Sequence, residues 1–295
     1  MEEIKKSTVD RPQTIVGSGR WTVDLMNIKN KVIIITGASS GIGEATAYAF
    51  AKQHCKIVLA ARNIEKLEAV KIKCLAFGAE CLLVKCDVSK EEDCKQLIQS
   101  TIQQFNTINI LINNAGISMR ALFADLDLSV IKQVMDINFW GTVYCTKYAM
   151  PYLLKEKGSL IGVSSVAGIK GLPGRTGYSA SKFAMNGFMD SLRVENIKTG
   201  LHVGVICPGY TASNIRNTAL NKEGKVQTET PLDESKLMSA STVADEILKM
   251  IEHRKAEVVL TSQGKLTKLI NKFFPRLLDK MVYNVVSKEK DSPFK

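Results

Sequence analysis

The sequence lacks the cysteine and histidine spacing that holds a metal ion or builds a disulfide framework. Its seven cysteines are odd in number and scattered, and none falls in a Cys-x-x-Cys pair. The three histidines, His54, His202 and His253, do not cluster with them. This pattern argues against a zinc site and against a stapled secreted fold. It favours cysteines that serve as small buried side chains in a reducing cytosol.

Long apolar runs are also missing. No stretch approaches the roughly 18 consecutive apolar residues that span a bilayer. The first residues, MEEIKKSTVD, carry early acidic side chains and no apolar core of the kind that a signal peptide has. We therefore expect a cytoplasmic protein.

Acidic residues are in deficit. The 29 Asp and Glu are outnumbered by 40 Lys and Arg, which gives a net charge of +11. This balance favours anionic ligands or surfaces, such as a nucleotide phosphate, an anionic membrane or nucleic acid. The chain has no recognised nucleic-acid-binding motif and no interleaving of aromatic and basic residues, and part of the basic excess lies near its end. We therefore expect no nucleic-acid partner.

Short apolar runs alternate with helical patterns along most of the 295 residues. Runs rich in Val, Ile and Leu predict strands at 31–36, 56–61, 81–86, 108–113, 159–165, 201–207 and 257–261. Between them, segments such as 64–77 and 90–105 repeat apolar residues at helical spacing. The pattern predicts one doubly wound α/β domain over residues 31–260, with a mostly parallel seven-stranded sheet covered by helices on both faces. Residues 1–30 are expected to be an extension, and 261–295 a separate tail.

Ligands of such sheets bind beyond the carboxyl ends of the strands. The first strand runs into TGASSGIG, residues 36–43. Its glycines suit a sharp turn, a close approach of backbone to ligand, and tight packing of the next helix, whose first amides then face a pyrophosphate. A purely structural turn is the alternative. The candidate cofactor contacts here are Gly37, Ser39, Ser40, Gly41, Ile42 and Gly43.

The next strand ends supply further candidates. Ala61 stands where an acid that binds the ribose of NAD would be, and Arg62 follows, which favours the 2′-phosphate of NADP(H). An arginine that faces only solvent is the alternative. Asp87 is placed to accept a hydrogen bond from an adenine amino group or to cap the following helix. Ser89 is also placed to cap that helix. The fourth strand ends in NNAG, where Asn114, Ala115 and Gly116 are expected to pass close to a ligand.

The segment YSASK brings Tyr178 and Lys182 onto one helix face, because residues four apart on a helix are neighbours. A nearby ammonium lowers the pKa of a phenol from its usual ~10, which would suit Tyr178 to exchange a proton with a carbonyl or alcohol oxygen. Ser165, at the end of the fifth strand, is placed to donate a hydrogen bond to the same oxygen. Lys182 is also placed to hold the ribose of a nicotinamide, whose hydride chemistry belongs to the cofactor.

These motifs resemble those of the short-chain dehydrogenases/reductases, in order and spacing, over about residues 31–260. The resemblance rests on TGASSGIG, NNAG, the Asn138 of MDINFWG, Ser165, Tyr178-x-x-x-Lys182 and the PG at 208–209. It implies an NAD(P)-dependent oxidoreductase with a Rossmann-like fold and an Asn138–Ser165–Tyr178–Lys182 tetrad, in which Asn138 anchors a water that relays protons through Lys182. It adds Pro208, Gly209, Thr211 and Ser213 as cofactor contacts. Ser213 stands where the family often has Thr. Family members are commonly dimers or tetramers, so a homodimer or homotetramer is expected.

The tail carries an unbroken apolar stripe from Leu266 to Val286, with lysines and arginines on the other side and Pro275 between two expected helices. Such a basic amphipathic segment, 265–286, is typical of peripheral membrane contact. Packing on its own domain or on a second subunit is the alternative. The expected substrate is a lipophilic carbonyl or alcohol, steroid-, retinoid- or long-chain acyl-like. Its expected pocket includes Met119, Arg120, Leu172, Pro173 and Tyr210, with Arg120 either meeting an acidic group of the substrate or facing solvent. An NADP(H)-binding sensor on the same fold is the alternative function.

Overall fold

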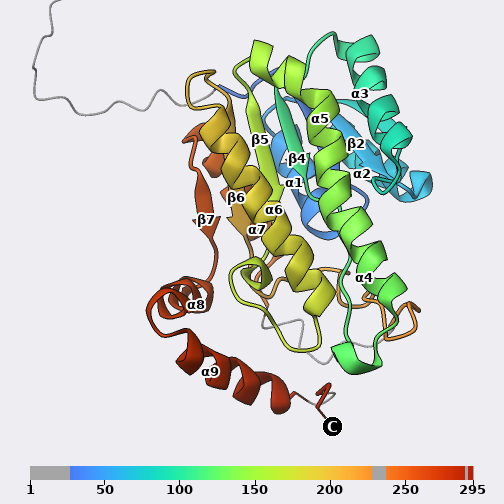
Figure 1. Ribbon diagram of the computed structural model, residues 1–295. Coiled ribbons are helices and arrows are strands. Elements are labelled where there is room, and N and C mark those ends of the chain that lie inside the picture. Colours follow the sequence, from blue (N-terminus) through green and yellow to red (C-terminus); the bar gives the residue numbers. More distant parts are fainter. Residues whose placement is uncertain (1–26, 228–236, 290–291, 295) are drawn as a thin grey trace, which may run out of the picture.

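The computed structural model describes residues 27–227, 237–289 and 292–294. Within them lies one sheet of seven parallel strands in the order β3-β2-β1-β4-β5-β6-β7 (Figure 1). The strands are β1 Val32–Thr36, β2 Lys56–Ala61, β3 Glu80–Lys85, β4 Ile110–Asn113, β5 Ser159–Val163, β6 His202–Cys207 and β7 Glu257–Val259. Every expected strand is present, and the predicted doubly wound fold is confirmed.

Helices connect the strands and cover both faces of the sheet. They are α1 Gly41–Ala51, α2 Ile64–Ala76, α3 Glu91–Phe105, α4 Leu128–Met135, α5 Gly141–Lys155, α6 Thr176–Glu195, α7 Ala240–Glu252, α8 Ser262–Phe273 and α9 Pro275–Ser287. A π-helical turn at Asp136–Trp140 joins α4 to α5, and short 3-10 turns lie at Phe123–Asp125 and Val166–Gly168. In Figure 1 the helices α3, α5 and α6 lie in front of the sheet.

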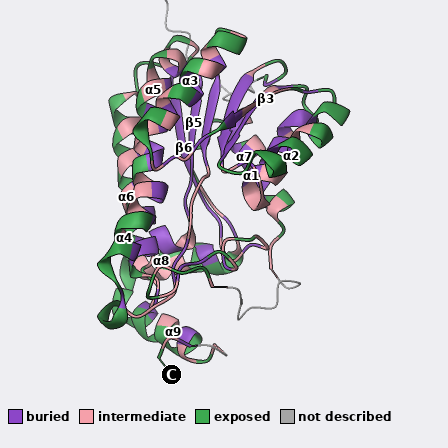
Figure 2. Ribbon diagram, turned by 90° about the vertical axis from the view of Figure 1, so that its right-hand side faces the viewer, coloured by how far each residue is buried: buried purple, intermediate pink, exposed green. Residues whose placement is uncertain are grey.

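Most of the core consists of two apolar layers separated by the strands. Side chains alternate between the faces of a strand, so Ile33 and Ile35 pack with α1, α2 and α7, whereas Ile34 packs with α3, α5 and α6. All three isoleucines are fully buried, and Figure 2 shows the strands as a buried layer between partly exposed helices. This burial on both faces explains why the strands are continuous apolar runs.

The strand order places a crevice beside β1. Its neighbours are β2 on one side and β4 on the other, so the chain leaves β1 in one direction and later returns to the opposite side. Loops that follow β1 and β4 therefore diverge at the carboxyl edge of the sheet and leave space between them. The residues that end the strands meet at this edge.

The tail forms two helices, α8 and α9, with Pro275 at the first position of α9. Proline suits that position because it needs no amide hydrogen there. Both helices lie beyond the carboxyl edge of the sheet (Figure 1). On α9, Leu278 and Val286 are only 3% and 6% exposed, so this part of the apolar stripe packs on the protein's own domain.

Polar contacts also fasten the tail. The Arg120 guanidinium lies 2.8 Å from the Glu289 carboxylate, and both side chains are largely buried. Lys170 pairs with Asp279 at 2.5 Å. Of the two roles expected for Arg120, neither is found, because its charge is matched by the end of the tail rather than by substrate or solvent.

Residues 1–26 of the expected extension lie outside the described residues. Ile28 is buried in the core, and the amide of Asn30 donates to the carbonyl of His54 at 3.1 Å, so this short stretch is tied to the domain. In the part of the chain that the structure describes, no helix combines the length and the apolar character needed to cross a membrane.

Candidate active site

A large cavity of about 800 Å³ lies along the carboxyl ends of the strands. It brings together nearly all of the residues singled out in the sequence. Those that line it are Gly37, Ser39, Ser40, Gly41, Ile42, Arg62, Asp87, Asn114, Ala115, Gly116, Ser165, Tyr178, Lys182, Pro208, Gly209, Thr211 and Ser213. Two candidates, Gly43 and Asn138, lie behind its wall.

The turn between β1 and α1 requires glycine at two positions, where any other side chain would collide with the backbone. Gly37 has a φ of +66°, and a Cβ on it would lie 2.8 Å from the Cα of Ala115. A Cβ on Gly43 would lie 2.3 Å from the carbonyl oxygen of Gly37, so Gly43 serves helix packing and not ligand contact. The Ser40 side chain makes no capping hydrogen bond, which leaves the first amides of α1 available to an anion. The cavity beside this turn therefore fits the pyrophosphate of a dinucleotide.

Thr36 joins this turn to the loop after β4. Its Oγ1 accepts hydrogen bonds from the amides of Asn114 and Ala115 at 3.0 and 3.1 Å. The side chain of Asn114 in turn donates to the Thr36 carbonyl at 2.9 Å. Asn114 thus fixes the two loops relative to each other. Sequence reasoning missed Thr36, and its position just before the first glycine of the motif is the signal that was available.

One end of the cavity is basic. Arg62 follows β2 and is exposed, and Lys66, in the first turn of α2, lines the same end. The Asn63 side chain between them caps α2 by accepting from the Lys66 amide at 2.8 Å. Lys66 was missed from the sequence, although a basic residue in the first turn after a possible 2′-phosphate contact is a usable signal.

Asp87 lines the cavity, but the structure corrects its expected capping role. Its Oδ1 accepts from the amide and the hydroxyl of Ser89 at 3.1 and 2.8 Å, which closes a tight turn. Helix α3 begins later, after Lys90, and has no side-chain cap. The local turn therefore occupies both Asp87 and Ser89 and keeps them from the helix end.

The central group consists of Ser165, Tyr178 and Lys182. Ser165 follows β5 and its Oγ accepts from the amide of Ala167 at 3.1 Å. Tyr178 and Lys182 lie one turn apart on α6, with the Lys182 Nζ 5.9 Å from the centre of the tyrosine ring. The Lys182 ammonium donates to the carbonyl of Val163 at 2.8 Å. Two buried ionisable groups and a hydroxyl thus meet at one wall of the cavity.

The acidities of these groups differ from the expectation. Burial raises the pKa of the Tyr178 phenol, and this effect outweighs the Ser165 hydrogen bond and the nearby Arg175 and Arg216, which lower it. Burial also lowers the pKa of Lys182 to about 8. Ser165, Arg175 and Arg216 lower the pKa of Tyr178, and Lys182 does not. The expectation that the Lys182 ammonium brings the pKa of this phenol below its usual value is therefore wrong for the protein without cofactor. The phenol stays protonated at neutral pH, which is the state needed for donating a proton.

Asn138 is buried in the π-helical turn and reaches backbone rather than the cavity. Its Oδ1 accepts from the Ile117 amide at 2.8 Å, and its Nδ2 donates to the Ile117 carbonyl and to the Ser181 hydroxyl, both at 2.9 Å. A Cβ on Gly116 would lie 3.1 Å from the Asn138 Oδ1. The Asn138 side chain therefore positions the loop after β4 against α6.

The loop after β6 closes over the phosphate turn. Thr211 is buried and its hydroxyl donates to the Gly209 carbonyl at 3.2 Å, while Arg216 donates to the Thr211 carbonyl at 2.9 Å. A Cβ on Gly41 would lie 3.2 Å from the Cβ of Ser213, so the loop and the turn are in near contact. Arg216 was missed from the sequence, where nothing distinguishes it from a solvated arginine.

The other end of the cavity is apolar, and the tail builds much of it. Leu266 and Ile270 of α8 and several residues of α9 line it, together with Leu172 and Tyr210. Of the other expected pocket residues, Arg120 and Pro173 lie outside this cavity. Met119 is fully buried in a separate cluster of apolar side chains between α4 and α6. The sequence did not identify the tail as a wall of the pocket, because its residues are far along the chain.

The fold and the site together define a nucleotide-dependent oxidoreductase of the doubly wound class. A family model described as short chain dehydrogenase matches residues 31–224. The chain therefore belongs to the short-chain dehydrogenase/reductase family, as the sequence motifs indicated, and is an enzyme that acts on CH–OH groups with a nicotinamide cofactor.

Relatives agree with this assignment, and a solved structure agrees with the fold. A "Dehydrogenase/reductase SDR family protein 7-like" from Dictyostelium discoideum is 33% identical over 266 residues, which cover 88% of this chain and 83% of the relative. An "11-beta-hydroxysteroid dehydrogenase A" from Arachis hypogaea is 36% identical over 261 residues, 86% of this chain and 74% of the relative. A short chain dehydrogenase/reductase from Burkholderia phymatum in complex with NAD has a TM-score of 0.77 at 22% identity, over 86% of this chain and 96% of that one. This last likeness shows the fold.

Proposed function

We propose that the protein is an NADP(H)-dependent oxidoreductase that interconverts the carbonyl and alcohol forms of a lipophilic substrate. The observation that carries the proposal is the meeting of Ser165, Tyr178 and Lys182 at one cavity wall, between a phosphate-binding turn and an apolar pocket. When bound, a reduced nicotinamide supplies the hydride that adds to the carbonyl carbon.

The chain's own residues handle the proton. The protonated Tyr178 phenol donates to the carbonyl oxygen as the C–H bond forms, and the oxygen becomes the hydroxyl of the product. The Ser165 hydroxyl accepts from the Ala167 amide and hydrogen-bonds with Tyr178 in the protein alone, and its hydrogen turns to the same carbonyl oxygen when the substrate binds. The nearby Arg175 and Arg216 guanidinium groups, which lower the pKa of the phenol, stabilise the phenolate that remains, and Lys182 lies beside it, with its Nζ 5.9 Å from the ring centre, where it is placed to hold the ribose of the nicotinamide. In the oxidative direction each transfer runs backwards.

The preference for NADP(H) is supported by the basic end of the cavity. Arg62 and Lys66 lie there together, and Ala61 leaves the end of β2 without an acid to hold a ribose hydroxyl. An arginine beside a phosphate forms charge-assisted hydrogen bonds that NAD(H) has no group to receive. Titrating the protein with NADPH and with NADH, and comparing the two dissociation constants, tests this preference.

The lipophilic substrate is supported by the apolar wall that α8 and α9 provide. Several relatives carry the name 11-beta-hydroxysteroid dehydrogenase or a similar one, which is in keeping with a large apolar substrate. The test is NADPH consumption with ketones and aldehydes graded by chain length and ring number, beside Tyr178→Phe. Removing the proton donor should lower kcat by about 10²- to 10⁴-fold. Equal turnover in the variant would contradict the mechanism, and NADPH binding without turnover of any carbonyl or alcohol would favour a sensor.

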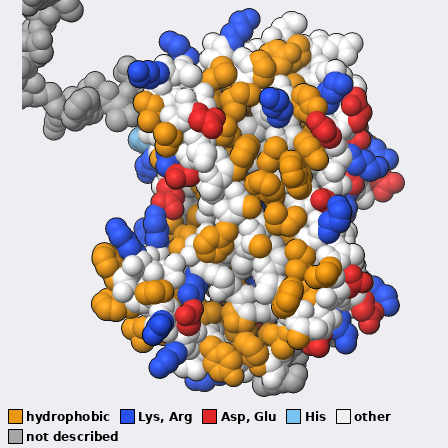
Figure 3. Space-filling model, in the orientation of Figure 1, with side chains coloured by type: hydrophobic (Ala, Val, Ile, Leu, Met, Phe, Trp, Pro, Cys, Tyr) orange, Lys and Arg blue, Asp and Glu red, His pale blue; other side chains and the backbone are white. Residues whose placement is uncertain are grey.

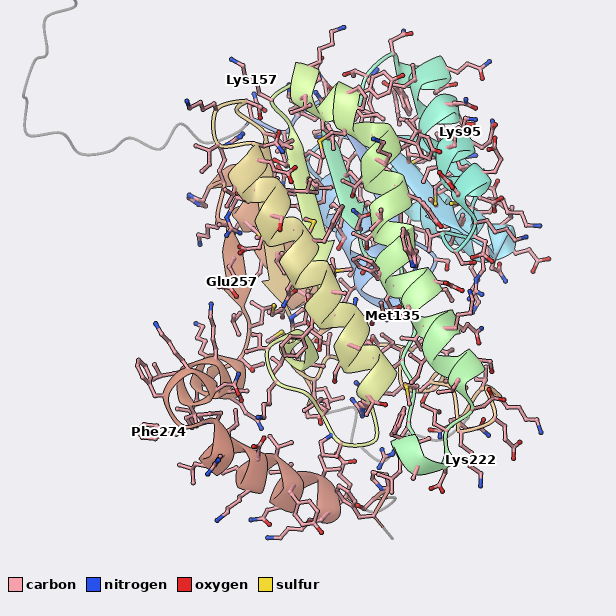
Figure 4. All side chains as sticks on the ribbon, viewed as in Figure 1. Lys95, Met135, Lys157, Lys222, Glu257 and Phe274 are labelled. Carbon is pink, nitrogen blue, oxygen red and sulfur yellow. The ribbon has the colours of Figure 1, made fainter. Side chains whose placement is uncertain are left out.

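We also propose a cytoplasmic enzyme that binds the surface of anionic membranes through its tail. On α8, α9 and the bend between them, four apolar side chains are more than half exposed, and lysines and arginines lie among them: Leu269, Phe273, Phe274 and Leu277. Phe274 lies at the bend between the two helices, at the outer margin of the molecule (Figure 4). Replacing Phe274 and Leu277 with serine should abolish sedimentation with vesicles that contain anionic lipid. Phe123→Ser, which changes an equally exposed phenylalanine outside the tail, should leave it unaltered.

A homodimer or homotetramer is supported by a second exposed surface. Apolar side chains gather over α5 and α6 (Figure 3), where Trp140, Phe183 and Val194 are between 44% and 61% exposed. Contiguous apolar patches of this kind usually mark interfaces. Light scattering should give a mass of two or four chains, and Phe183→Glu should reduce it to one.

A further inference from the structure

The apolar end of the cavity also carries positive charge. Lys170, Arg175 and Arg216 line it beside Tyr178. Of the described residues that line the cavity, Asp87 is the one with a carboxylate, and it follows β3, near the basic nucleotide end and away from α9. The substrate end thus combines apolar walls with cationic side chains.

Two of these cations have partners within the protein. Lys170 pairs with Asp279 on α9, and Arg216 donates to the carbonyl of Thr211. Arg175 differs from them. It is half-buried, lies over the ring of Tyr210 at 5.9 Å, and forms no ion pair with any described carboxylate.

The position of Arg175 places it on the substrate side of the reacting group. It precedes α6 directly and is three residues before Tyr178, so it is adjacent to the proton donor. It also borders a small adjoining pocket with Val286 and Glu289 of the tail, where the Glu289 carboxylate pairs with Arg120. Arg175 therefore lies between Tyr178 and the apolar wall formed by α9.

Such a guanidinium suits one kind of ligand group. A planar fork of donors that is half withdrawn from water and lies over an aromatic ring binds a carboxylate through paired hydrogen bonds. Leaving this half-buried guanidinium without an anion beside apolar walls is unfavourable, since a charge that is partly withdrawn from water loses part of its hydration. A substrate that carries its own negative charge removes this cost.

We propose that the substrate is an amphipathic oxo or hydroxy acid, whose carboxylate pairs with Arg175 while its apolar body lies against α8 and α9. This inference rests on the proposed function. It adds that the substrate is negatively charged and that Arg175 recognises this charge. Arg175 is then a specificity residue: it selects anionic over neutral lipophilic carbonyls near Tyr178.

The experiment compares matched substrates. Medium- and long-chain oxo fatty acids and their neutral primary amides are offered to the full-length protein with NADPH, and kcat/KM is measured for each pair. The variants are Arg175→Gln, Arg175→Lys and, as a control, Arg193→Gln. Arg193 lies on the same helix, but it pairs with Asp190 and does not line the cavity.

The parent protein should prefer acids over amides by about ten- to a hundredfold, the range expected for one charge-assisted pair. Arg175→Gln should remove this preference, mainly by raising KM for the acids. Arg175→Lys should keep part of it, and Arg193→Gln all of it. The ratio of acid to amide is the readout, because a general loss of folding or of activity lowers both members of a pair alike.

Binding distinguishes failure of this inference from failure of the proposed function. Calorimetric titration of the protein–NADP⁺ complex with dodecanoate and with dodecanamide requires no turnover. Tighter binding of dodecanoate that is lost in Arg175→Gln supports the inference even if no carbonyl is reduced. Equal handling of acids and amides by an active parent protein would overturn it while leaving the oxidoreductase intact. A loss of NADPH affinity in Arg175→Gln, with acid preference unchanged, would also overturn it and would assign Arg175 to the cofactor.

Discussion

Replacing Asn138 with alanine tests whether this residue acts through the loop after β4. The side chain makes three hydrogen bonds of 2.8, 2.9 and 2.9 Å and is wholly buried. Its removal leaves the amide and the carbonyl of Ile117 without those partners. The Ser181 hydroxyl keeps one bond, because it still donates to the Tyr178 carbonyl at 2.7 Å.

The magnitude follows from the two backbone groups that lose their partners. A fully buried group left without a hydrogen bond costs about 1 to 3 kcal/mol. Because Ile117 is half-buried, its two groups should lower the free energy of unfolding by an amount near the lower end of their sum, about 3 kcal/mol. At roughly 2 °C per kcal/mol for a domain of this size, the melting temperature should drop by about 6 °C. Because the displaced loop contains Gly116, which lines the cavity, the affinity for NADPH should weaken as well.

The assay is thermal unfolding by calorimetry, with and without NADPH. Asn196→Ala is the matched control: its Nδ2 also donates to a backbone carbonyl, at 2.8 Å, but the residue is half-exposed and water can replace it. The control should cost less than about 1 kcal/mol. If Asn138→Ala and Asn196→Ala melted at the same temperature, the positioning role of Asn138 would be refuted. An effect of Asn138→Ala on turnover without an effect on stability would point to a direct part in proton transfer.

Three further predictions concern the charged groups. Because the pKa of Lys182 falls from 10.5 to about 8 on folding, the unfolded chain binds more protons between these values, and stability should rise as pH rises from about 8 toward 10.5. Lys182→Met should therefore be more stable than the parent at pH 7, by up to about 3 kcal/mol in the free energy of unfolding, and this advantage should disappear near pH 10. A difference in melting temperature between variant and parent that stayed the same at all pH values would contradict this. Arg62→Gln should weaken NADPH binding about tenfold and leave NADH binding unchanged in fluorescence titrations. Equal losses of affinity for the two cofactors would show that Arg62 does not bind the 2′-phosphate. Arg120→Met leaves the buried Glu289 carboxylate without this partner. It should speed proteolytic cleavage of the tail without altering NADPH affinity, and an unchanged cleavage rate would show that the ion pair does not hold α9.

Much of the fold follows from local patterns. Buried parallel strands need apolar residues on both faces, so the seven runs of Val, Ile and Leu predicted the sheet directly. Tyr178 and Lys182 were placed together because spacing on a helix fixes their separation. The glycines after the first strand predicted the ligand-binding turn correctly, because a Cβ at Gly37 or Gly43 would collide with neighbouring backbone atoms.

What escaped prediction depends on contacts between distant segments. Arg120 and Glu289 are 169 residues apart, and no local pattern pairs them. Met119 follows a strand end, as a pocket residue would, yet the packing of α4 against α6 encloses it completely. The pKa of Tyr178 was misjudged because burial, a property of the whole fold, outweighs the neighbouring charges that a sequence displays.

Much of the apolar wall of the cavity comes from a segment that follows the last strand. Every residue assigned to the cofactor or to proton transfer precedes Thr261, whereas α8 and α9 begin after it. Selection for a new substrate can therefore act on one continuous terminal stretch without disturbing the geometry of hydride transfer. Among descendants of a common ancestor, this arrangement predicts fast divergence after β7 and slow divergence before it. It also makes the terminal stretch a natural unit for grafting between relatives when a different substrate is wanted.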